Sequence, residues 1–267
     1  FYSNTDFAID TIRDMEIAFI HNSLLNDPFD PFFDLITEFN SYAELREQIN
    51  KNYNKKEAAK FLSQCDRNTF AKLKHNWNAY TKKLRKNIFI FSCCTENEKL
   101  SLLPENNLYM WAHYANGHRG VAIEFNSELL IEEAREQGNI AVDYPGWDQI
   151  IYRDELSSIT SGHWYDCIIK EDDSSLFQVI GNNTRTKSKV WEFENEWRLW
   201  WRNDEGNNSK KVKKIKIPND AISKIYFGHL TDEKVKKLIK NNAKFNFPNA
   251  KIIQKKKKKG ELALESV

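Results

Sequence analysis

Strand-like stretches recur along most of this chain, but helical patterns do not alternate with them one for one. Period-two alternation or β-rich composition predicts strands at residues 16–21, 87–93, 120–125, 140–144, 193–201, 211–217 and 222–227. Helical periodicity and capping residues predict helices at residues 4–13, 42–84, 106–115, 127–137 and 231–241. This mixed order favours an α+β fold with a central mixed or antiparallel sheet flanked by helices.

A single α+β domain spanning residues 1–267 is the simplest organisation for a chain of this length. The 8 Trp, 10 Tyr and 17 Phe residues supply enough apolar area for a core, although 29% of the residues are charged. Residues 42–86 are the most polar and helix-dense block, and we expect them to form a helical insertion. A basic docking face is the alternative for this block, but acidic residues interrupt its lysines.

Charge and cysteine content narrow the classes of protein. Forty Lys and Arg against 38 Asp and Glu give a formal charge of +2, without a global signal for nucleic acid or membrane. The four cysteines show no CxxC spacing, which indicates a reducing compartment and argues against structural zinc. The sequence contains neither a membrane-spanning apolar run nor a signal-peptide pattern at residues 1–20. We therefore expect a cytoplasmic protein with no membrane partner and no bound metal.

The first segment whose side chains could take part in binding or catalysis is NDPFD, at residues 26–30. Pro28 restrains the preceding residue to an extended conformation, so this is a rigid turn after a strand. Asn26 and Asp27 are candidates for the lip of a ligand-binding cleft. The alternative is that their side chains cap the following segment.

The second segment is LYMWAHYANGHRG, at residues 108–120, which predicts a short helix stopped near Gly117. Met110, His113 and Tyr114 fall on one face of that helix. Such a face ordinarily packs into a core, and a lone histidine among aromatics is more often structural than catalytic. His113 is nonetheless a candidate catalytic residue.

The third segment is KSKVWEFENEWR, at residues 187–198. Read as a strand, its alternation places Glu192, Glu194, Glu196 and Arg198 on one face and the aromatic side chains on the other. This charged face is either a solvated sheet surface or the presentation of a carboxylate to a sugar undergoing substitution. The sequence has no GxSxG, GxxxxGK, GxGxxG or HExxH motif, so the corresponding hydrolase, kinase and zinc-protease classes lose support.

Together, NDPFD, MWAHYANGHRGVAIEF and KSKVWEFENEWR resemble the bacterial family of unknown function 2971 (DUF2971). The resemblance extends to YFG at residues 226–228, and residues 42–84 look like an insertion relative to that family. More distantly, the order of the segments is similar to ADP-ribosyltransferase-like folds. That similarity implies NAD as cofactor and, as activity, an ADP-ribosyltransferase or NAD glycohydrolase, an effector of a bacterial defence or toxin system.

The ADP-ribosyltransferase resemblance also implies roles for the carboxylates. Glu196 would be the catalytic glutamate, because a carboxylate near the anomeric carbon stabilises the positive charge that develops as nicotinamide leaves. Glu194 would position the acceptor nucleophile, and either a protein or a nucleic acid would serve as acceptor.

The same resemblance implies cofactor-binding roles. Trp111, His113 and Tyr114 would hydrogen-bond the ribose and stack on nicotinamide, while Arg198 or Lys187 would meet the pyrophosphate. Two departures from the pattern are that no first-strand His or Arg and no Ser-Thr-Ser strand are found.

Two other classes of function stay open at this point. In a nucleic-acid-processing or nucleic-acid-binding module, Asp27, Asp30, Glu194 and Glu196 would hold a divalent metal and lysine-rich stretches would contact phosphates. In a non-catalytic sensing or interaction domain, the same motif residues would form a buried polar network that fixes the fold. The lysine run at residues 255–259 predicts an exposed edge or turn, with a phosphate-binding role as the sharper alternative, and residues 261–265 predict a last strand.

Overall fold

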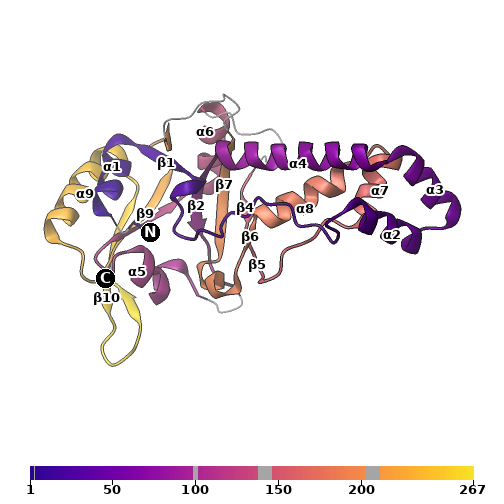
Figure 1. Ribbon diagram of the computed structural model, residues 1–267. Coiled ribbons are helices and arrows are strands. Elements are labelled where there is room, and N and C mark those ends of the chain that lie inside the picture. Colours follow the sequence, from indigo (N-terminus) through magenta and orange to yellow (C-terminus); the bar gives the residue numbers. More distant parts are fainter. Residues whose placement is uncertain (3, 99–101, 138–145, 203–210) are drawn as a thin grey trace. The chain divides into compact units, whose positions relative to one another are not determined.

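The computed structural model describes residues 1–2, 4–98, 102–137, 146–202 and 211–267 (Figure 1). The chain forms two compact units. The first unit consists of Phe1–His21, Phe89–Gln149 and Val190–Val267, and the second of Asn22–Ile88 and Ile150–Lys189.

A five-stranded sheet forms one part of the first unit, in the order β4 (Asp148–Gln149), β7 (Glu196–Arg202), β2 (Ile88–Cys94), β1 (Glu16–His21), β8 (Val212–Lys216). The pairs β1 with β2, β1 with β8 and β4 with β7 are antiparallel. In β1, alternate residues are buried, as the period-two pattern of its sequence predicts.

A four-stranded sheet forms the other part of the first unit, in the order β11 (Leu264–Ser266), β10 (Lys251–Lys257), β9 (Ile222–Phe227), β3 (Val121–Phe125). Strands β9 and β10 run parallel, whereas β3 with β9 and β10 with β11 are antiparallel. This sheet is therefore mixed.

The helices of the first unit are α1 (Thr5–Asp14), α5 (Leu108–Tyr114), α6 (Ser127–Gln137) and α9 (Glu233–Asn246), with a 3-10 turn η2 (Pro104–Asn106). Helix α1 packs against α9, and Asn246 at the end of α9 donates hydrogen bonds to the carbonyls of Ile12 and Arg13. These bonds satisfy carbonyls that the end of α1 leaves unpaired. A buried apolar cluster that includes Ile12, Phe19, Phe89 and Phe227 forms the core of this unit.

The second unit is mainly helical, with η1 (Asn22–Leu24), α2 (Tyr42–Asn52), α3 (Lys55–Gln64), α4 (Arg67–Asn87), α7 (Ser161–Ile169), α8 (Ser174–Thr184) and the short parallel pair β5 (Ile151–Tyr152) and β6 (Thr186–Lys187). Side chains of Ser41, Asn54 and Asp66 accept hydrogen bonds from backbone amides at the starts of α2, α3 and α4. The unit has its own apolar core, centred on residues such as Phe39, Phe61 and Trp164.

The structure confirms the α+β class and the presence of mixed and antiparallel sheets. The block at residues 42–86 is helical, as predicted, and falls within the second unit. Its status as an insertion and the organisation of the chain as one domain stay predictions. The strand predicted at residues 140–144 lies outside the described residues. Helices α7 and α8 were not predicted.

The strand predicted at residues 193–201 is wrong at its start, because residues 189–194 form the 3-10 turn η3 (Lys189–Glu194) and β7 begins only at Glu196. The lysine run was expected to be a turn or exposed edge. Lys255 to Lys257 belong to β10 and pair there only with β11, beyond the end of β9, so they lie on an edge of the sheet, and Lys259 lies in the turn that follows. Within the described residues, no helix is both long enough and apolar enough to cross a bilayer.

Candidate functional site

The third motif changes conformation at Asn195, which separates η3 from β7. Asn195 has φ 41°, a left-handed conformation that asparagine tolerates better than most residues. Its side-chain amide donates to Thr95 Oγ1 at 2.9 Å and to the carbonyl of Glu96 at 2.6 Å. Because of this turn, Glu194 and Glu196 do not alternate along one strand, contrary to the sequence prediction.

Glu196 and Arg198 lie two residues apart on β7, so both side chains point to the same face of the five-stranded sheet. Arg198 Nε donates to Glu196 Oε1 at 2.6 Å and Arg198 Nη2 donates to Glu196 Oε2 at 2.9 Å. Glu196 is 6% exposed and Arg198 is 1% exposed. The two residues therefore form a buried, bidentate ion pair. The guanidinium predicted to meet a pyrophosphate is engaged by a protein carboxylate.

Glu194 is buried at the end of η3 and is held from helix α5. The hydroxyl of the half-buried Tyr114 donates a hydrogen bond to Glu194 Oε1. This contact brings together two residues that the sequence placed in the site on separate segments.

Asn107 fixes α5 relative to η3, and sequence reasoning missed it. Its Oδ1 accepts from the backbone amides of Tyr109 and Met110 at the start of α5. Its Nδ2 donates to the carbonyl of Phe193 at 2.8 Å. The sequence signal was an asparagine near the start of a helical pattern, where asparagine is a preferred N-cap, but nothing local revealed its second partner.

Four aromatic side chains from α5 and η3 contact one another and form what we call the aromatic surface: Tyr109, His113, Trp191 and Phe193. Ring centroids of Phe193 lie 5.4 Å from Tyr109, 5.8 Å from His113 and 6.0 Å from Trp191. Tyr109 is 64% exposed and His113 is also exposed. Planar rings are thus available to solvent next to the residues that hold Glu194.

Trp111 lies on the other side of α5 and is fully buried. Its indole Nε1 donates to the carbonyl of Glu105 at 2.8 Å, and its ring makes an edge contact with Phe1. The stacking role predicted for Trp111 does not fit this position, since its ring packs in a cluster with Ala115, Ala122 and Tyr226. Trp111 and His113 are two residues apart and therefore point to roughly opposite sides of the helix, and packing on the sheet decided which side is buried.

The remaining predicted site residues, Asn26, Asp27 and Lys187, belong to the second unit. Asp27 Oδ1 accepts from the backbone amide of Phe29 at 2.9 Å, which is the turn-forming alternative considered for this motif. Lys187 and Asp30 form a buried ion pair with 3.6 Å between Nζ and Oδ2. Asn26 is exposed.

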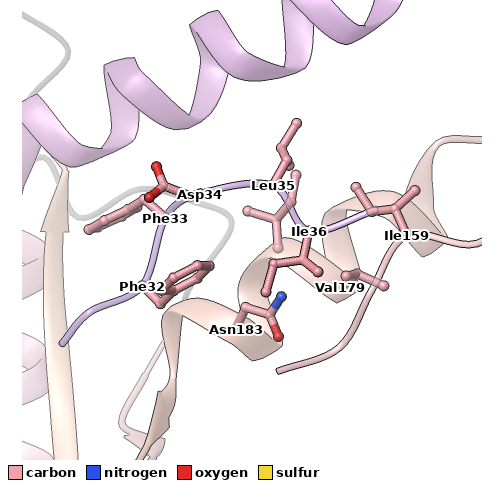
Figure 2. Close-up of a pocket in the computed structure, with 9 residues that line it drawn as sticks. Phe32, Phe33, Asp34, Leu35, Ile36, Ile159, Val179 and Asn183 are labelled. Carbon is pink, nitrogen blue, oxygen red and sulfur yellow. The ribbon is translucent and has the colours of Figure 1, made fainter. Parts of the chain in front are cut away.

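A pocket in the second unit lies between the segment of Phe32 to Ile36 and the helix that carries Val179 and Asn183 (Figure 2). Its walls are mainly apolar, and it has no room for a water molecule. The Asn183 side chain is hydrogen-bonded to both the backbone amide and the carbonyl of Ser157. We interpret this pocket as a gap in packing and not as a ligand site.

Among the described residues, the structure adds no candidate for metal binding and none for catalysis by a thiol. Among the residues that the structure describes, no group of three or more His, Cys, Asp or Glu side chains is placed to hold a metal ion. Burial raises the pKa of the Cys93 thiol to about 12, and burial also raises the pKa of Cys94. Both thiols on β2 are therefore protonated and poorly nucleophilic near neutral pH.

The fold and this site define an α+β protein with two buried glutamates and an exposed aromatic surface in one unit. Glu194 accepts a hydrogen bond from Tyr114, and Glu196 accepts hydrogen bonds from Arg198. Residues 110–199 match the model of the family described as "Protein of unknown function (DUF2971)". The match bears out the predicted resemblance to this family over residues 110–199, which include His113, Tyr114 and the Glu194 to Arg198 motif. No curated protein and no solved structure matches the chain. The resemblance to ADP-ribosyltransferase-like folds stays a prediction.

Proposed function

We propose that the first unit binds a nucleotide-type small molecule on the aromatic surface. The observation that carries this proposal is the cluster of contacting rings around Phe193, of which Tyr109 is 64% exposed. Stacking on such rings is available to any nucleobase or nicotinamide, since all of them present a flat π face. Asn107 supports the surface by holding both α5 and η3, so little ordering is needed on binding.

NAD is the nucleotide that we propose as ligand. It carries two planar groups, adenine and nicotinamide, either of which fits an open stacking surface. The His113 ring, exposed beside Phe193, adds a hydrogen-bonding group within reach of a ribose placed next to the stacked ring.

A finer proposal is that the site cleaves the bond between nicotinamide and ribose, as an NAD glycohydrolase or an ADP-ribosyltransferase. The observation that favours it is the hydrogen bond from Tyr114 to the buried Glu194. Nicotinamide would leave as a neutral molecule with the bonding electron pair, and ribose C1′ would carry positive charge. Water or an acceptor hydroxyl would then attack C1′ and lose its proton to a carboxylate, for which Glu194 is the candidate.

In this proposal Glu196 has a different role from Glu194. Both of its carboxylate oxygens accept hydrogen bonds from Arg198, so it is held in place and its charge is compensated. We therefore assign Glu196 a positioning role on β7, and Glu194 replaces it as the candidate for contact with the reacting sugar.

A non-catalytic binding or sensing domain is the second candidate function, and the Glu196–Arg198 pair favours it. A buried ion pair between two side chains of one strand is the pattern of a network that fixes the fold. In that case the aromatic surface would bind the nucleotide without changing it.

The two candidates separate in one set of measurements on the purified chain with NAD. Binding is followed by calorimetry, and free nicotinamide is followed by mass spectrometry over time. Tyr109→Ala should weaken binding by about fivefold or more, the cost of losing one stacking contact. Its matched control is Tyr42→Ala, which removes a ring from the second unit.

Glu194→Gln should abolish nicotinamide release while leaving NAD affinity within about twofold, because the group acts on the reacting sugar and not on the stacked ring. Binding without release, in both the original chain and the variant, would leave the non-catalytic domain as the function. If NAD does not bind at millimolar concentration, the nucleotide proposal is wrong.

A further inference from the structure

Strands β10 and β11 form a hairpin whose outer part extends past the end of β9 (Figure 1). The pairing of β10 with β9 ends at Gln254 opposite Phe227, whereas Lys255 to Lys257 pair only with β11. Lysines occupy positions 255–259 of this hairpin, and Lys256, Lys257 and Lys259 are exposed. The outer part of the hairpin is thus a concentrated positive surface.

The lysines of this hairpin belong to an uneven distribution of charge along the chain. Residues 221–267 contain twelve Lys and no Arg against four Asp and Glu, although the whole chain has a formal charge of only +2. Acidic residues elsewhere in the chain offset this excess of lysine, so the net charge is low although residues 221–267 are basic. Such a basic region attracts polyanions locally. Lysines on an exposed edge strand discourage pairing with another chain, which explains some of these lysines but does not require a run of five.

Lys255 anchors the hairpin and does not itself offer a charge to solvent. It is 1% exposed, and its Nζ donates to Asn106 Oδ1 at 2.7 Å and to Ser266 Oγ at 3.0 Å. Asn106 is followed by Asn107, whose side chain donates to the carbonyl of Phe193. Two consecutive asparagines therefore connect the hairpin on one side to the aromatic surface on the other.

The strand register places a second lysine on the side of the hairpin that faces α5. Lys257 pairs with Leu264, and Leu264 packs against the buried cluster that contains Trp111 of α5. Paired residues in an antiparallel ladder point to the same face, and so do residues two apart on one strand. Lys257 thus lies on the same face as Lys255, one step further along β10 and exposed to solvent.

We propose that the first unit binds single-stranded nucleic acid, with phosphates along Lys256, Lys257 and Lys259 and bases stacked on the aromatic surface. The combination of a basic hairpin with exposed rings in the same unit fits this partner, because phosphates and unpaired bases are recognised together. A duplex keeps its bases stacked internally and cannot use the rings. The inference rests on the proposed function only in using the aromatic surface to stack a base, and it requires no cleavage of NAD.

The test measures binding of a fluorescent 20-nucleotide poly-dT strand, by anisotropy, across a series of salt concentrations. The first variant is the triple Lys256→Ala, Lys257→Ala, Lys259→Ala, which omits Lys258 because it pairs with Glu261. Its matched control is Lys55→Ala, Lys56→Ala, Lys60→Ala, which removes the same charge from exposed positions on α3 of the second unit. A second variant is Tyr109→Ala.

The hairpin variant should bind at least tenfold more weakly. The plot of log affinity against log salt has a negative slope, and the magnitude of that slope should decrease by about 2, for three lost phosphate contacts. Tyr109→Ala should weaken binding by about fivefold or more without changing the salt slope. The control should behave as the original chain does.

Equal weakening by the control triple would show that only net charge matters and would overturn the proposal. So would tighter binding to a duplex of the same length, or binding to vesicles of anionic phospholipid with no binding to the strand. The NAD measurements report separately on the proposed function. Binding of the strand without binding of NAD would support this inference and contradict the proposed function. Binding of NAD without binding of the strand would support the proposed function and contradict this inference.

Discussion

The guanidinium of Arg198 donates hydrogen bonds to both carboxylate oxygens of Glu196, two residues earlier on the same strand. Both side chains are almost completely buried, at 1% and 6% exposure. Burying a charge is costly unless a partner compensates it, so each of these residues depends on the other. The pair therefore acts as a structural unit of β7 whether or not the site is catalytic.

Removal of one member of this pair should destabilise the protein strongly. Glu196→Leu or Arg198→Met alone should cost about 3 to 5 kcal/mol of unfolding free energy, because the remaining charge stays buried without its bidentate partner. The double variant should lose much less than the sum, since neither charge of the pair then remains buried. Urea unfolding of the four proteins measures this, and additive losses would contradict the prediction.

The hydroxyl of Tyr114 should matter more than that of Tyr109, although both tyrosines lie on α5. Tyr114→Phe removes the hydroxyl that donates to the buried Glu194 and should cost about 1 to 3 kcal/mol of unfolding free energy. Tyr109→Phe is the matched control, because Tyr109 is 64% exposed and its loss of a hydroxyl should change stability by less than about 0.5 kcal/mol. Thermal or urea unfolding distinguishes them, and equal effects would show that the Glu194 contact contributes nothing to stability.

The sequence predicted the local elements well where one face of an element is buried and the other is exposed. The strand at Glu16–His21 and the helix at Ser127–Gln137 begin and end at the predicted residues. It also placed Glu196 and Arg198 on one face, because alternation is a property of the strand alone. Their ion pair follows directly from that placement.

The sequence failed where contacts between distant segments decide the conformation. The aromatic and acidic residues before Asn195 alternate like a strand, yet Phe193 packs on Tyr109 and the chain turns through a left-handed residue. Likewise, nothing near Trp111 indicates that its ring packs with Tyr226, which lies more than a hundred residues later. Periodicity carries no information on such partners.

Alkaline pH should destabilise the first unit through two buried weak acids. Burial raises the pKa of the Tyr2 hydroxyl to about 12 and that of the Cys93 thiol to about 12. The unfolded chain releases these protons at about pH 8.5 for a thiol and about pH 10 for a phenol. Between those values and pH 12 the folded state holds more protons than the unfolded state, so stability is complete below about pH 8.5 and falls as pH rises.

Unfolding free energy measured from pH 7 to pH 11 tests this, with Tyr2→Phe and Cys93→Ser as variants that cannot ionise. Each variant should show a shallower loss of stability at high pH than the original chain. Identical pH profiles in all three proteins would show that neither group is responsible.

Gly228 closes the turn that joins β9 to α9, and we expect it to tolerate no side chain. A Cβ at this position would lie 2.3 Å from the carbonyl oxygen of His118 and 3.0 Å from the Trp111 ring. The two backbones are held together there, because Gly228 N donates to the carbonyl of Gly120 and Leu230 N donates to that of His118. Relief of the clash would separate β9 from the segment that follows α5.

Gly228→Ala should therefore cost about 1 to 3 kcal/mol or more of unfolding free energy. It should also weaken binding to the aromatic surface, since α5 carries both Trp111 on its buried side and Tyr109 on its exposed side. Gly162→Ala on α7 is the control: a Cβ there meets nothing closer than 3.4 Å, and alanine favours the helix. A Gly228→Ala protein as stable as the original would mean that the two backbones separate without cost, and that α5 is not positioned by the end of β9.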